Sequence, residues 1–282
     1  MTPQEMLIHH ARSFAPAARL LPRDDYDRIA RLYALCRTVD DLADTEGGPI
    51  VQARLTAIAG ALRAGPPEDA PDPLVTQARA LFADHPAGLN AFADLVSTAT
   101  SDTGTTCIAD DAELDRYCMG VAGTVGIMVC ALFDVPPQWH GPASDLGRAM
   151  QLTNICRDVI EDAQAGRRYL PYTLCPHTPA DIATPSLEVR TNLRATIDEL
   201  LARSDVLYAN GRAGLPALPL RLRLAVGAAA AIYAGIGDEL RARSCDPLAG
   251  RVFVPRWRKI LLAAQGTRSQ LFAHQDRYHV QH

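Results

Sequence analysis

The chain has 282 residues, 48% of them hydrophobic and only 6% aromatic, and its formal net charge at pH 7 is −4. A chain of this length can bury a sizeable core and lies near the upper limit for one domain. Since the balance of charge is acidic and no basic block is present, nucleic acid is not expected as a partner.

Alanine and leucine recur at three- and four-residue spacing through most of the chain, which predicts α-helices. The predicted helices cover residues 24–44, 50–64, 73–83, 87–100, 111–133, 142–164, 186–211, 217–243 and 255–273. Capping residues predict helix starts at Asp110-Asp111, at Ser144-Asp145 and at Pro185-Ser186. Alternating strand patterns bounded by hairpin turns are missing from the sequence, so we expect one all-α domain over residues 1–282.

The first segment with functional character lies near the end of the predicted helix 24–44. There Tyr33, Arg37, Asp40 and Asp44 share one helical face. Two carboxylates four residues apart repel each other by a few tenths of a kcal/mol, and acids near a helix C-terminus oppose the helix dipole. The pattern fits a solvated acidic face, or a site where a cation offsets the repulsion.

A second segment repeats this arrangement in the predicted helix 142–164. Gln151, Asn154, Asp158 and Asp162 share a polar stripe. Together the two helices suggest one cleft with an acidic patch on each wall. Carboxylate and amide oxygens suit hard divalent cations, and magnesium keeps positions open for water and phosphate oxygens. The sequence therefore suggests a site for metal-bound diphosphates.

Both segments resemble the paired Asp-x-x-x-Asp motifs of the squalene and phytoene synthases. The segment from Tyr117 to Gly126, YCMGVAGTVG, is similar to a third signature of that family, and Ser13-Phe14 and the 256–259 segment are weaker matches. The resemblance spans about residues 10 to 265. It implies a single-domain, isoprenoid-synthase-type helical bundle around a central cavity.

The resemblance also implies roles for particular residues. Mg²⁺, with Mn²⁺ as an alternative, would be held by Asp40, Asp44, Asn154, Asp158 and Asp162, and these aspartates would act in catalysis with Tyr33 and Arg37. Prenyl diphosphate substrates would contact Ser13, Phe14, Tyr117, Val121, Gln151, Asn154, Arg157, Tyr233 and Lys259.

The reaction implied is the head-to-head condensation of two geranylgeranyl diphosphates to phytoene through a cyclopropyl diphosphate, prephytoene diphosphate. The amino-acid sequences of segments 122–128 and 158–171 resemble those of bacterial phytoene synthases most. NADPH is then not expected. The alternatives are synthesis of squalene, which would require NADPH, or of hydroxysqualene or dehydrosqualene from farnesyl diphosphate. A non-catalytic assembly protein is a further alternative, which the two intact aspartate motifs disfavour.

Gly120, Gly123 and Gly126 recur every three residues within a predicted helix, where each glycine costs about 1 kcal/mol relative to alanine. Close helix packing and room for a long prenyl tail both explain them.

Location is predicted from what the sequence lacks. Residues 1–14 do not resemble a secretory signal, and the uncharged stretch 224–237 is too short to span a bilayer. The seven scattered cysteines suit a reducing compartment. We expect a cytoplasmic protein that can associate peripherally with the inner membrane surface. Oligomeric state is left open.

Overall fold

The computed structural model of the protein describes residues 1–272 apart from 11–17, 19–20, 44–47, 65–71 and 102–105. Within these residues the chain is built of helices, and extended pairing is limited to one bridge between Cys107 and Arg168. The predicted all-α class is confirmed.

The α-helices are α1 (Pro3–His10), α3 (Arg23–Asp41), α4 (Gly48–Arg63), α5 (Pro73–Leu81), α6 (Pro86–Ser101), α7 (Asp111–Cys118), α8 (Thr124–Leu132), α9 (His140–Gln164), α10 (Pro179–Ala183), α11 (Leu187–Gly214), α12 (Leu220–Ala242) and α13 (Arg256–Phe272). A π-helical turn, Met119–Gly123, joins α7 to α8, and a 3₁₀ turn, Pro137–Trp139, leads into α9.

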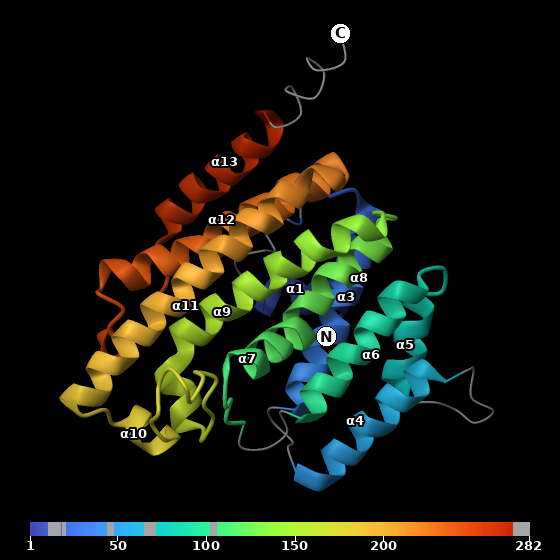
Figure 1. Ribbon diagram of the computed structural model, residues 1–282. Helices are drawn as coiled ribbons and strands as arrows, with labels where there is room; N and C mark the ends of the chain where they lie inside the picture. Colours follow the sequence, from blue (N-terminus) through green and yellow to red (C-terminus); the bar gives the residue numbers. More distant parts are fainter. Residues whose placement is uncertain (11–17, 19–20, 44–47, 65–71, 102–105, 273–282) are drawn as a thin grey trace.

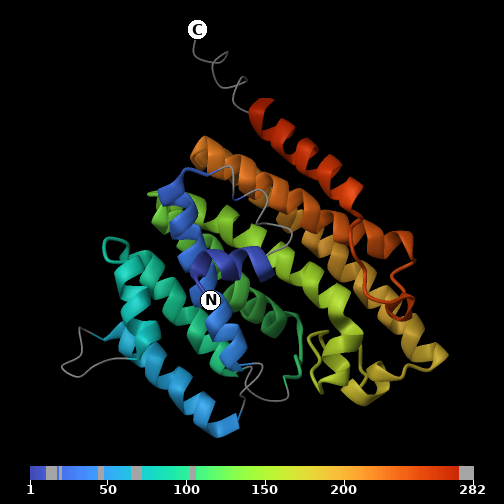
Figure 2. The ribbon, with the colours of Figure 1, turned by 180° about the vertical axis from the view of Figure 1, so that it is seen from behind.

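The helices form two packed groups, which meet where α8 contacts α9. α9, α11, α12 and α13 run side by side across one half of the molecule, and α4, α5 and α6 form the other half (Figure 1). From behind, α1 lies against α3 (Figure 2). Each half has its own apolar cluster, one built mainly from α3–α6 and α8, the other from α7 and α9–α12.

Two of the three predicted helix starts are confirmed. Asp110 caps α7 by accepting from the Glu113 amide, while the Glu113 carboxylate accepts from the Ala109 amide. Ser186 caps α11 by accepting from the Val189 amide. The start at Ser144 is wrong, because α9 begins at His140 and Ser144 is buried inside it.

The predicted helix 111–133 is interrupted by the π-helical turn. A Cβ added at Gly120 would meet the Thr98 side chain and one at Gly123 the Met119 side chain, whereas Gly126 lies against a backbone. A Cβ added at Gly126 would lie 2.2 Å from the Ala143 carbonyl oxygen of α9. One added at Gly147 would lie 2.1 Å from the Ala122 oxygen. Close packing therefore explains Gly126, although this glycine also lines the central cavity described below.

Two short helices, α1 and α10, were not predicted from the sequence. α1 has eight residues and α10 only five, too few for a periodic pattern to emerge. A capping box did mark α10: Thr178 accepts from the Asp181 amide, and the Thr178 amide donates to the Asp181 carboxylate.

Two stretches, Asp111–Leu132 and Leu220–Ala242, are long and apolar enough to cross a membrane by length and composition alone. Core helices pass the same test, and 61% of the apolar window of the second stretch is buried among its neighbours. The seven cysteines are free thiols, and five of them are buried.

Candidate functional site

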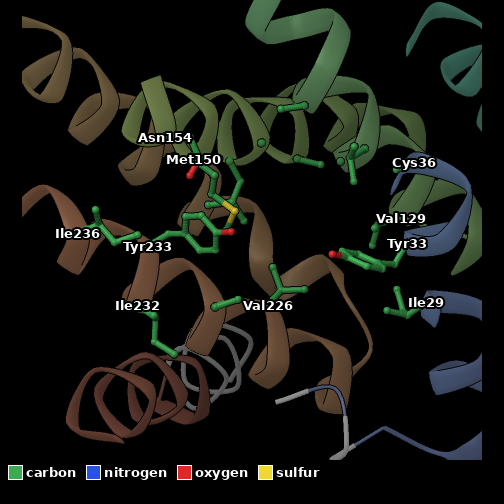
Figure 3. Close-up of a pocket in the computed structure, with 18 of the residues that line it drawn as sticks. Ile29, Tyr33, Cys36, Val129, Met150, Asn154, Val226, Ile232, Tyr233 and Ile236 are labelled. Atoms are coloured by element: carbon green, nitrogen blue, oxygen red, sulfur yellow. The ribbon is translucent and has the colours of Figure 1, made fainter. Parts of the chain in front are cut away.

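A cavity of about 1130 Å³ lies between the two halves of the molecule. Its walls come from α3, α8, α9 and α12, with the loop before α13 closing one side. Most of the lining is aliphatic, including Ile29, Val129, Met150, Val226 and Ile232 (Figure 3). Ordinary small-molecule pockets measure about 300–1,000 Å³, so this one suits a large apolar ligand.

Six polar side chains predicted from the sequence line this cavity, five of them from α3, α9 and α12 and the sixth, Lys259, from α13. Tyr33 and Arg37 lie one turn apart on α3, Asn154 and Arg157 lie on one face of α9, and Tyr233 enters from α12. Tyr33 and Tyr233 point their hydroxyls toward one another (Figure 3). Burial raises the pKa of both tyrosines, so each keeps its proton near neutral pH.

Asn154 has an unsatisfied oxygen. Its Oδ1 atom is buried and makes no hydrogen bond with any residue that the structure describes. A buried acceptor without a partner costs about 1–3 kcal/mol, so its retention calls for a ligand. Asp158 follows one turn later on the same face. An amide oxygen beside a carboxylate fits a hard divalent cation.

Asp158 is held by two arginines. Arg157 donates from Nε to Oδ1 at 2.8 Å and from Nη2 to Oδ2, and Arg251 Nη2 lies 3.1 Å from Oδ1. The Asp158 side chain is 19% exposed. Both arginines line the cavity, and the carboxylate lies at its edge rather than among the lining residues. The pair of guanidinium groups is well suited to phosphate oxygens.

At the end of α3 the carboxylates lie nearer to solvent. Asp40 is exposed, and Arg37 pairs with the neighbouring Asp41. Asp40 and Asp41 both act to raise the pKa of Tyr33, whereas Arg37 acts to lower it. Asp44 lies outside the described residues. Among the parts of the chain that are described, no cluster of three or more His, Cys, Asp or Glu side chains forms a metal site.

Besides Asp40 and Asp158, four predicted residues do not line the large cavity. Asp162 borders a separate void of about 10 Å³ together with Arg168 and Tyr169. Tyr117 stacks on Tyr169 with ring centroids 4.9 Å apart. The other two residues are half-buried, Val121 in the π-helical turn and Gln151 on α9. Ser13 and Phe14 lie outside the described residues.

Lys259 of α13 lines the cavity, as do three basic residues that sequence analysis did not assign to the site. Arg251 precedes α13 in an irregular loop, so no periodicity marked it. Arg256 opens α13 within a weakly matching motif. His10, the last residue of α1, is exposed and also borders the cavity.

Arg168, adjacent to the second motif, is structural. Its guanidinium donates to the Ile108 oxygen at 2.9 Å and to the His177 oxygen at 3.1 Å, joining two loops. The cavity cysteines are inert, because burial raises the pKa of Cys130 to about 11 and raises that of Cys36 as well.

A family model described as squalene/phytoene synthase matches residues 7–258. Phytoene synthase of Cereibacter sphaeroides is 35% identical over 95% of this chain and 79% of its own length. Phytoene synthase of Thermus thermophilus is 33% identical over 91% of this chain and 88% of its own length. A solved dehydrosqualene synthase with bound ligand has a TM-score of 0.81 and 27% identity, covering 96% of this chain and 95% of its own. A squalene synthase from Alicyclobacillus acidocaldarius has a TM-score of 0.74 at 22% identity, and the match covers 87% of this chain and 94% of that protein.

Proposed function

Because the chain belongs to the squalene/phytoene synthase family and is a prenyltransferase, we propose that it condenses two geranylgeranyl diphosphates head to head to phytoene. The curated relatives named above are phytoene synthases, which favours the C20 substrate. The observation that carries the proposal is the cavity itself, which is aliphatic over most of its surface and includes the basic side chains of Arg37, Arg157 and Arg251 in its lining. An isoprenoid diphosphate has the same division into an apolar tail and an anionic head.

The arginines bind and orient the diphosphates in this proposal. Arg157 and Arg251 both form ion pairs with the Asp158 carboxylate. Guanidinium groups bind phosphate with the same planar geometry as carboxylate. An incoming diphosphate can therefore replace the Asp158 carboxylate on one or both arginines. Asp158 would then be released to bind a cation next to the Asn154 oxygen.

The proposed metal ligands are Asp40, Asp44, Asn154, Asp158 and Asp162, with Mg²⁺ preferred and Mn²⁺ as the alternative. The buried, unpaired Asn154 oxygen supports this set. When bound, the ions would neutralise the diphosphate as it departs. EDTA should abolish turnover and added magnesium should restore it; activity that persists in EDTA would contradict the assignment.

In the proposed reaction the C1–O bond of one substrate breaks and diphosphate leaves as an anion. The double bond of the second substrate attacks the resulting allylic cation, and loss of a proton closes prephytoene diphosphate. A second ionisation, rearrangement and proton loss give phytoene. The aliphatic lining excludes water that would quench the cations, and the faces of Tyr33 and Tyr233 can stabilise them by about 0.5–2 kcal/mol each.

Synthesis of dehydrosqualene, squalene or hydroxysqualene from farnesyl diphosphate is the second candidate. The likeness to a dehydrosqualene synthase over nearly the whole chain favours it. NADPH would be needed only if squalene is the product. Peripheral association with the cytoplasmic membrane surface is part of the proposal, because a C40 hydrocarbon leaves the cavity more readily into lipid than into water.

The test is incubation of the purified protein with magnesium and geranylgeranyl or farnesyl diphosphate, with and without NADPH, followed by mass analysis of the hydrocarbons. We expect a C40 product from geranylgeranyl diphosphate that does not depend on NADPH. A C30 product alone would move the assignment to the squalene branch. No product from either substrate would favour a non-catalytic relative.

A further inference from the structure

The outward side of α13 carries a row of exposed apolar side chains. Phe253 just before the helix and Trp257, Ile260 and Leu261 within it are between 52% and 71% exposed. Within α13, the spacing of three or four residues places Trp257, Ile260 and Leu261 along one side of the helix, and Phe253 precedes its first turn. We call these four residues the outer stripe. Contiguous exposed apolar surface of this kind marks an interaction site.

The other side of α13 is already used for packing. A Cβ added at Gly266 would lie 2.5 Å from the Gly227 oxygen of α12, and one added at Gly235 would lie 2.4 Å from the Leu262 side chain. In both ribbon views α13 lies along α12 at the outer edge of the bundle (Figures 1 and 2). Formation of the bundle therefore does not bury the outer stripe.

The segment that carries the stripe is strongly basic. Residues 247–272 contain four arginines and one lysine and no acidic residue, in a chain whose net charge is −4. Arg258 pairs with Asp238 and Glu239 of α12, while Arg256 is exposed beside the stripe. A symmetric contact between two copies would bring these like charges together, whereas anionic headgroups would neutralise them.

The outer stripe is also continuous with the cavity. Phe253 and Ile260, both exposed, line the cavity together with Arg256 and Lys259. Apolar surface therefore runs from the interior of the molecule to its outside at this edge. A partner covering the stripe would lie against the cavity mouth.

We propose that the outer stripe is the surface by which the protein docks on an anionic lipid bilayer, with the cavity mouth against the membrane. Tryptophan and phenylalanine favour the headgroup boundary, and nearby basic side chains add electrostatic attraction to anionic lipid. The inference deepens the proposed function by giving its product an exit, but docking itself requires no turnover.

The experiment is co-sedimentation of the full chain with vesicles of phosphatidylcholine alone or mixed with phosphatidylglycerol. We expect binding to the mixed vesicles that weakens as salt is raised. The variant W257Q/L261Q should lower the partition coefficient by about tenfold or more, since two apolar side chains lose their burial in lipid. Neither residue lines the cavity, so hydrocarbon synthesis in detergent should stay at the wild-type level.

The matched control is L187Q/V206Q, which makes the same kind of change at two exposed apolar residues of α11. It should bind vesicles like the wild type. Trp257 is one of two tryptophans, so quenching by brominated lipid should be strong in the wild type and much weaker in W257F.

Three results would overturn the inference. They are no binding of the wild type to mixed vesicles, binding by W257Q/L261Q as strong as that of the wild type, or a loss of vesicle binding in L187Q/V206Q as large as that in W257Q/L261Q. A dimer that dissociates in W257Q/L261Q, without vesicle binding, would assign the stripe to a second copy instead. Failure of the proposed function would show as missing hydrocarbon product while vesicle binding persisted.

Discussion

α3 and α9 carry the same pair of carboxylates four residues apart, yet the two helices place them in different surroundings. Asp40 lies in the last turn of α3, is exposed, and has no basic residue within that turn to offset the helix dipole. Asp158 lies well inside the 25-residue α9 and is only 19% exposed. Its charge is compensated by Arg157 and Arg251.

The difference shows how burial changes the demands on one motif. An exposed carboxylate is stabilised by water, while a buried one requires a counter-charge or must take up a proton. The compensation for Asp158 comes from Arg157 of α9 and from Arg251 of the loop before α13, the groups that we propose bind diphosphate. The proposed function would therefore couple substrate binding to release of the Asp158 carboxylate.

The largest effect is expected from neutralising each carboxylate in turn. Both Asp158→Asn and Asp40→Asn should lower kcat/KM by about 100-fold or more, because each removes a proposed metal ligand. Only Asp158→Asn should also lower the free energy of unfolding, by about 1–3 kcal/mol, since it leaves two guanidinium groups without their carboxylate. Asp40→Asn should change it by less than about 0.5 kcal/mol.

Urea denaturation and steady-state kinetics on the same preparations separate these effects. Wild-type turnover in Asp40→Asn would remove α3 from the metal site and leave α9 alone. Unchanged stability in Asp158→Asn would show that the two arginines do not depend on this carboxylate.

Asn154→Leu should separate stability from activity. The change removes a buried, unpaired oxygen, so the free energy of unfolding should stay level or rise by about 1 kcal/mol. Activity should fall by about 10–100-fold if that oxygen binds metal. Val226→Leu, a change of the aliphatic lining alone, is the control. Full activity in Asn154→Leu would argue that α9 contributes only carboxylates to the proposed metal site.

The loop that brings Arg251 to Asp158 is anchored by a third carboxylate. Asp246 accepts from Arg190 and Arg194 of α11, and the hydrogen bonds from Arg190 hold its pKa well below the usual range. We expect Asp246→Asn to raise KM by about 2–10-fold with a smaller change in kcat, because Arg251 is then less firmly positioned.

The ion pairs of Asp246 also predict that the stability of the fold decreases in acid. A depressed native pKa means that the unfolded chain binds the proton more readily, so this stabilisation is complete above the ordinary pKa of about 4 and fades as pH falls below it. Urea midpoints measured at neutral pH and at successive values below about 4 should fall less steeply in Asp246→Asn than in the wild type. Equal slopes would contradict a role for Asp246 in acid unfolding.

The smallest effect is expected at Asp41, the neighbour of Asp40. Its pairing with Arg37 is partly exposed, at 36% and 47% for the arginine and aspartate side chains. Asp41→Asn should cost less than about 0.5 kcal/mol of stability and should change kcat/KM less than about threefold. A loss as large as that of Asp40→Asn would show that the two adjacent carboxylates act together, and circular dichroism melts with kinetics would detect it.

Much of the fold could be predicted because helical periodicity and capping depend on neighbouring residues. α6 was predicted at 87–100 and extends over Pro86–Ser101, and the caps at Asp110 and Ser186 were recognisable from local chemistry. The failures were also local in origin. Ser144 has the character of a cap, but the turn at Pro137–Trp139 leads directly into α9, so the helix begins before it.

The sequence by itself determined the all-α class, the family, and the two faces that bring Tyr33, Arg37, Asn154 and Arg157 to a common cavity, since residues one turn apart must share a helical face. Only the tertiary structure decided how each carboxylate is solvated. It also placed Arg251 on Asp158 and left the outward side of α13 uncovered. Those outcomes depend on contacts between segments far apart in the chain, which no local pattern encodes.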